Sequence, residues 1–99
     1  MGAQGTTSVS FGVAPGSMLA TAIVTGQSGI QSTSLCEAWI GNTPTSDHTD
    51  LEHSVIDSRG ASYRCGAIVP DTGSGGGFTI TVLLNVQVSG SLNVNWVWN

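Results

Sequence analysis

The sequence contains very little charge. Among its 99 residues there is no lysine, and Arg59 and Arg64 are the only cations beside six carboxylates, so charged residues make up 8% of the chain. An ordinary soluble domain carries about 25%. Proteins that bind nucleic acids or anionic membrane surfaces need clustered lysine and arginine to neutralise phosphates. The net charge of -4 therefore argues against both classes of partner.

Long apolar runs are also missing. No stretch approaches the roughly 18 residues that a membrane-spanning helix needs, and the first residues lack the basic and apolar regions of a secretory signal. Disorder is not expected, because the apolar residues are regularly spaced and the three tryptophans favour burial. We expect a single domain over residues 1–99.

Cysteine is scarce too. Cys36 and Cys65 are the only two, which is too few for a disulfide scaffold in a chain this short. Both lie in strand-like segments, and two interpretations stay open. The pair forms one bridge between adjacent strands, or it consists of two separate buried thiols.

What the sequence does have is a repeated alternation of apolar and polar residues, the period of a β-strand. It is clearest over residues 78–88 and 92–98, which Ser89-Gly90-Ser91 connects. We expect these two segments to form a hairpin near the centre of the fold. Shorter alternating sets occur around residues 9–13, 20–25, 35–40 and 63–69.

This pattern predicts an all-β protein of about six or seven short strands and almost no helix. The fold class is a small antiparallel β-sandwich or jelly roll, with a small barrel as the alternative. Thr49 and Glu52 have the spacing of a capping box, which indicates a helical turn. A short strand is expected around Val55 and Ile56, and a flexible loop over residues 70–77.

Five metal-capable side chains fall within the segment 47–53. In a helix His48 and Glu52 would share a face, and in a strand His48, Asp50 and Glu52 would do so. A symmetric oligomer can complete such a site around its axis. The spacing matches no named zinc motif, so we expect a solvated loop without a metal or other cofactor. The candidate ligands are His48, Asp50, Glu52 and His53.

The triplet Asp71-Thr72-Gly73 resembles the active-site motif of retroviral aspartic proteases, in which two such carboxylates share a proton. It departs from that family because it lies late in the chain, directly after Pro70. The alternative is a turn that uses Asp71 for local hydrogen bonds. No Gly-x-Ser-x-Gly elbow or phosphate-binding loop is present. We therefore expect no enzyme and no catalytic residues.

Trp96 and Trp98 share one face with Leu92 and Val94, which favours a position in the core. If they were exposed in line, they would instead form a sugar-stacking platform. The opposite faces carry further apolar residues, which we expect to form a second apolar patch and to pack between subunits of a homo-oligomer, with a trimer favoured. These residues are Leu35, Trp39, Leu83 and Val97.

Six short segments, in order, carry a resemblance over most of the chain: Pro15-Gly16-Ser17, Val24-Thr25-Gly26-Gln27, Glu37-Ala38-Trp39-Ile40, residues 47–53, Gly77-Phe78-Thr79-Ile80 and Asn95-Trp96-Val97-Trp98. Together they resemble a group of short β-rich proteins encoded by tailed bacteriophages and prophages. That group has no defined activity, so the resemblance implies a virion context and no site residues.

We therefore expect a non-enzymatic structural protein of a phage particle, made in the host cytoplasm and built into the virion. Capsid decoration or cement is the first expectation, with the major capsid protein as partner. A tail, baseplate or fibre component is the alternative within the same context. A small lectin-like binding module is the alternative from another class.

Overall fold

The computed structural model describes residues 2–41, 44–46, 48–58 and 60–99. The described residues form six β-strands and one α-helix. In chain order these are β1 (Ala3–Ser10), β2 (Ser17–Gln27), β3 (Cys36–Ile40), α1 (Asp50–Ser58), β4 (Ser62–Val69), β5 (Gly76–Val88) and β6 (Ser91–Trp98).

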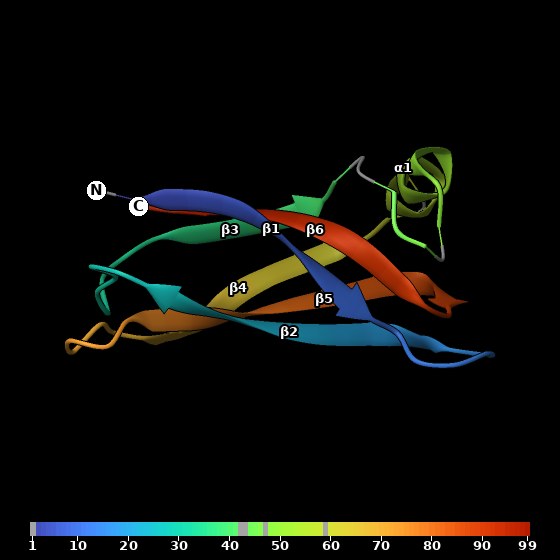
Figure 1. Ribbon diagram of the computed structural model, residues 1–99. Helices are drawn as coiled ribbons and strands as arrows, with labels where there is room; N and C mark the ends of the chain where they lie inside the picture. The colour runs from blue at the N-terminus through green and yellow to red at the C-terminus, as the bar shows by residue number, and fades with distance from the viewer. Residues whose placement is uncertain (1, 42–43, 47, 59) are drawn as a thin grey trace.

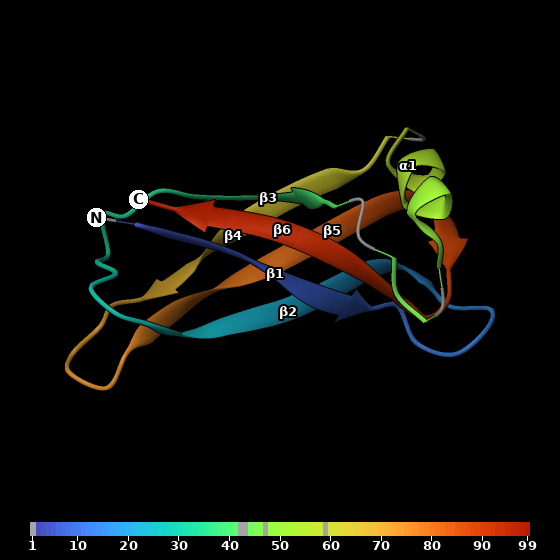
Figure 2. The same ribbon diagram turned by 45° about the horizontal axis from the view of Figure 1, so that its top comes forward.

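The strands form two three-stranded antiparallel sheets. Sheet A has the order β1-β6-β3, and sheet B has the order β2-β5-β4. The two sheets lie face to face as two layers, with α1 at the end opposite the chain termini (Figure 1; Figure 2). The prediction of a small all-β sandwich with about six strands is confirmed.

The expected hairpin between residues 78–88 and 92–98 is wrong. β5 is the central strand of sheet B and β6 is the central strand of sheet A, so the link between them crosses from one sheet to the other. Gly90, with a φ of 81°, makes this crossing. Its backbone bonds to the loop after β1, with Gly90 N donating to Gly12 O and Phe11 N donating to Gly90 O.

The core lies between the sheets and is formed mainly by the inner faces of β5 and β6. Phe78 and Trp96 meet edge to face, with ring centroids 5.5 Å apart. Trp96 pairs with Gly5 on one side and Ala38 on the other, and these small residues make room for its indole. Trp98 Nε1 donates to Gln27 Oε1 at 2.9 Å. The predicted core position of both tryptophans is confirmed.

Two alternating sets end earlier than the sequence suggests. In β4 the register shifts between Gly66 and Val69, where Ala67 has a φ of 52°. This bulge turns Val69 outward, although it continues the alternation of Tyr63 and Cys65. Similarly, β1 ends at Ser10, so Val13 is exposed in the loop that follows.

Candidate functional site

The helix α1 begins with the predicted capping box. Thr49 N donates to Glu52 Oε1 at 2.8 Å, and Glu52 N donates to Thr49 Oγ1 at 3.2 Å. The hydrogen bond from the Thr49 backbone lowers the pKa of the Glu52 carboxyl. The helix then continues to Ser58, so the expected strand at Val55 and Ile56 is wrong. Ile56 instead packs against the core from the helix.

His53 attaches α1 to sheet A. Its side chain is fully buried, and both ring nitrogens have partners. Nδ1 donates to Thr49 O at 2.7 Å, and Nε2 accepts a hydrogen bond from Asn93 N, at the start of β6, at 3.0 Å. Because Nε2 accepts, the ring is neutral in this arrangement. His53 therefore joins two backbone segments and has no lone pair left for a metal.

The other candidate ligands do not form a metal site with His53, although the His48 ring lies edge to face with it at 6.4 Å between ring centroids. His48 Nε2 donates to Ser89 O at 2.6 Å, and its Nδ1 lies 3.7 Å from Glu52 Oε2, which is longer than a hydrogen bond. Asp50 Oδ1 accepts from Leu51 N. Asp47 lies outside the described residues. The described residues contain no group of three potential ligands, and the segment 48–53 fixes the helix at the end of the sandwich.

We predict that His53→Ala lowers the free energy of unfolding by roughly 3 kcal/mol, because it removes the two hydrogen bonds of the buried ring and opens a cavity. Val55→Ala, on the exposed side of the same helix, is the control and should change stability by less than about 0.5 kcal/mol. Urea titrations of the two variants measure both values. Equal stability of the two variants would contradict this role.

The Asp71 carboxylate closes the loop between β4 and β5. It accepts hydrogen bonds from the backbone N–H groups of Gly29, Gly73 and Gly75, at 2.8, 2.9 and 2.8 Å. These three donors, with Gly29 contributing most, lower the pKa of Asp71. These contacts match the interpretation of Asp71-Thr72-Gly73 as a turn in which Asp71 accepts local hydrogen bonds. They also connect this loop to the loop after β2 and order a segment that the sequence suggested was flexible.

We predict an acid-dependent contribution from Asp71. Because its pKa is lower in the folded state, its stabilisation is fully present above the unfolded pKa of about 3.9 and is lost as the pH falls through the folded value. The wild type should therefore be more stable than Asp71→Asn at pH 7, and the difference should shrink below about pH 4. Thermal melts from pH 7 to pH 2 measure this. Parallel curves over that range would show that the carboxylate charge is not involved.

The two cysteines lie next to each other on different sheets. Cys36 is at the start of β3 and Cys65 is in β4, the edge strands on the same side of the sandwich. Both are half-buried free thiols. Burial and the adjacent Cys36 thiol raise the pKa of Cys65 to about 12. Cys36 and Cys65 are therefore free thiols that lie next to each other across the two sheets. They are not the two separate thiols of one interpretation, and the bridge of the other is not formed.

The expected second apolar patch is divided between two opposite faces. Leu83 lies on the outer face of sheet B, whereas Val97, Leu35 and Trp39 lie on or beside the outer face of sheet A. The sequence pattern placed them together because it treated β5 and β6 as one hairpin. The structure therefore has two outer surfaces with different side chains.

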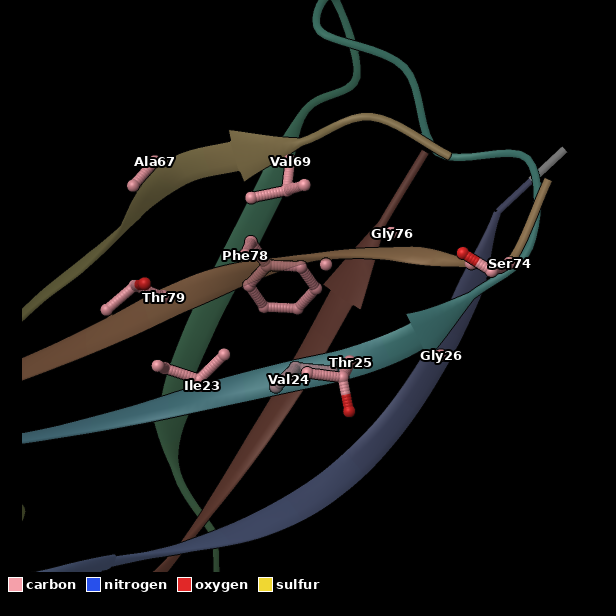
Figure 3. Close-up of a pocket in the computed structure, with 12 residues that line it drawn as sticks. Ile23, Val24, Thr25, Gly26, Ala67, Val69, Ser74, Gly76, Phe78 and Thr79 are labelled. Atoms are coloured by element: carbon pink, nitrogen blue, oxygen red, sulfur yellow. The ribbon is translucent and has the colours of Figure 1, made fainter. Parts of the chain in front are cut away.

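The outer face of sheet B is apolar and rich in threonine. Leu19 pairs with Leu83, and both side chains are half exposed. Further along, a hollow of about 400 Å³ extends over the glycines at the start of β5. Ile23 from β2 and Val69 from β4 stand on either side of it (Figure 3). Their side chains are 71% and 62% exposed.

The outer face of sheet A is more polar and carries one exposed tryptophan. Trp39 pairs with Asn95, and Asn95 pairs with Thr6 on its other side. A hollow of about 320 Å³ lies there, and Gln4 also lines it. Trp39 was expected to favour burial and to belong to an apolar patch, whereas it is exposed beside polar residues. The hollow was not foreseeable, because Thr6 and Asn95 are 89 positions apart in the chain.

Comparisons with protein-family models, curated proteins and solved structures find no match for this chain. Within the described residues, no helix is long and apolar enough to cross a membrane.

Proposed function

We propose that this chain is a non-enzymatic structural protein of a bacteriophage particle that decorates the capsid. The resemblance of six segments to phage-encoded β-rich proteins supports the virion context. The composition of the outer face of sheet B supports attachment to a protein surface. The protein would be made in the host cytoplasm and enter the virion during assembly.

The observation that carries the proposal is the low charge of this face. Leu19 and Leu83 form one row across the sheet, and Thr21, Thr81 and Arg64 form the next row. Ile23 and Val69 extend the apolar surface toward the hollow. Apolar and hydroxyl side chains with few charges are typical of the central part of a protein interface. A free monomer would leave this surface in contact with water.

The partner we propose for this face is the major capsid protein. Its matching surface would offer apolar side chains to Leu19 and Leu83 and a carboxylate to Arg64, since that guanidinium is the cation in the described part of this face. Self-association is part of the proposal, and a trimer fits a three-fold axis of a capsid. Attachment to the tail, baseplate or fibre is the alternative location.

Imaging of purified phage particles with labelled protein tests the proposal. We expect labelling over the capsid, and Leu83→Lys should abolish incorporation, because it places a charge at the centre of the interface. Leu51→Lys is the matched control, since Leu51 is an exposed leucine on α1 and lies outside the row of Leu19 and Leu83, and it should incorporate normally. Labelling of the tail would move the protein to the alternative location. Absence from purified virions would overturn the structural function.

Light scattering over a concentration series tests self-association separately. We expect a mass of three chains at high micromolar concentration. If the mass stays that of a monomer, the chain does not associate in solution, and copies could meet only on the capsid lattice.

A further inference from the structure

We propose that the hollow beside Trp39 binds a neutral saccharide, with one sugar ring stacked on the Trp39 indole and its hydroxyl groups bonded to Asn95 and Gln4. This site is separate from the face that the proposed capsid attachment uses. The proposal does not depend on that function.

Trp39 provides the stacking surface. It is 42% exposed, whereas Trp96 and Trp98 are buried in the core. The ring therefore presents apolar area to solvent beside a hollow of about 320 Å³. A sugar ring has one apolar face of C–H groups and an edge of hydroxyl groups, so it matches a flat aromatic side chain surrounded by polar groups.

The Asn95 amide beside the indole is positioned before a ligand arrives. Thr6 Oγ1 donates to Asn95 Oδ1 at 2.8 Å, which fixes the Asn95 amide and leaves its nitrogen to donate to a ligand. The Gln4 amide lies in the same hollow and offers both a donor and an acceptor. Gln4, Trp39 and Asn95 lie on strands β1, β3 and β6 of one sheet. Side chains on such a rigid backbone bind a ligand at a lower entropic cost than side chains on loops.

The charge on this face disfavours an anionic ligand. Glu37 precedes Trp39 by two residues, is exposed, and lies on the same face of β3. Arg64, on β4, belongs to the other sheet, so the described part of the Trp39 face has no cation to pair with an anion. A sialylated or phosphorylated glycan would therefore meet a carboxylate without a compensating positive charge.

An NMR titration of the isotope-labelled protein with saccharides tests the site. The resonance of the Trp39 indole N–H reports on binding. The probes are maltotriose, cellotriose and triacetylchitotriose as neutral ligands, with sialyllactose as the anionic one. We expect at least one neutral probe to shift the Trp39 signal and saturate in the millimolar range, and sialyllactose to bind more weakly.

Variants separate stacking from unspecific effects. Trp39→Ala should weaken binding by at least about tenfold, which corresponds to about 1.4 kcal/mol. Trp39→Phe should retain part of the affinity, because it keeps an aromatic ring. Leu35→Ala is the control, since Leu35 is exposed near the start of β3 but does not line the hollow, and it should bind like the wild type. Melting temperatures close to the wild type confirm that each variant is folded.

Three results would overturn the proposal. Saccharide binding would be excluded if no neutral probe shifts the Trp39 signal at a concentration about 20-fold above the expected millimolar dissociation constant. Equal binding by the wild type and Trp39→Ala would exclude the stacking site. A Trp39 signal that shifts with protein concentration alone, without a response to sugar, would assign this face to an interface between copies of the chain. Loss of particle incorporation in Leu83→Lys is measured independently, so the two proposals can fail separately.

Discussion

The Trp96→Asp variant is expected not to fold at 25 °C. Trp96 lies at the centre of the core, in edge-to-face contact with Phe78, and loss of a buried tryptophan side chain alone costs roughly 3–5 kcal/mol. The aspartate also places a carboxylate between two apolar sheets without a partner. A domain of this size has a net stability on the order of 5–15 kcal/mol, so the combined loss approaches or exceeds it.

Far-UV circular dichroism and thermal melts measure this outcome, and Trp39→Asp is the matched control. The same substitution at Trp39 occurs on the neighbouring strand β3, but on the outer face of the same sheet. It should cost much less than Trp96→Asp, because the charge remains in water. If Trp96→Asp keeps the wild-type melting temperature, the inward orientation of Trp96 is wrong.

Gly77→Val should have the second largest effect, a loss of roughly 3 kcal/mol or more. A Cβ atom at Gly77 would overlap the carbonyl oxygen of Val24 and lie 3.2 Å from Thr25 Cα. Both obstacles are backbone atoms of the hydrogen-bonded neighbour β2. They cannot rotate away as a side chain can, so β2 and β5 must separate locally.

Gly66→Ala provides the control for this prediction. Gly66 also lies in sheet B, but no atom lies within 4 Å of a Cβ added there, and its φ is not positive. The alanine should change stability by no more than about 1 kcal/mol in either direction. Chemical denaturation of the pair measures the difference. Equal midpoints would show that the start of β5 has room for a side chain.

The contacts of the site residues could be predicted from the sequence only where the partners are close together in the chain. The Thr49–Glu52 capping box joins residues three positions apart, so its spacing was sufficient to predict it. The contacts of Asp71 were predictable within its own turn, but its bond to Gly29 spans 42 positions. His53 looked like a metal ligand because its partner Asn93 is 40 positions away. Sequence spacing cannot show that both nitrogens of this ring are already hydrogen bonded to the backbone.

The sequence by itself determined which residues of β5 and β6 face the core. The alternation in residues 78–88 and 92–98 identified the inner faces of β5 and β6, because successive side chains of a strand point to opposite sides whatever its neighbours are. It also determined the start of the helix and the all-β class, since caps and strand periods are local properties.

Only the tertiary structure decided which strands pair. The same alternation fits a hairpin, whose apolar face needs a separate cover, and a crossing between sheets, in which β5 and β6 cover each other. Here Gly90 bonds to Gly12 and Phe11 instead of closing a hairpin, and β1 and β3 take the two edges of β6. That choice buries Trp96 against Phe78, places Leu83 and Trp39 on opposite surfaces, and thereby creates two distinct outer faces. Pairing depends on contacts between residues distant in the chain, which no local pattern records.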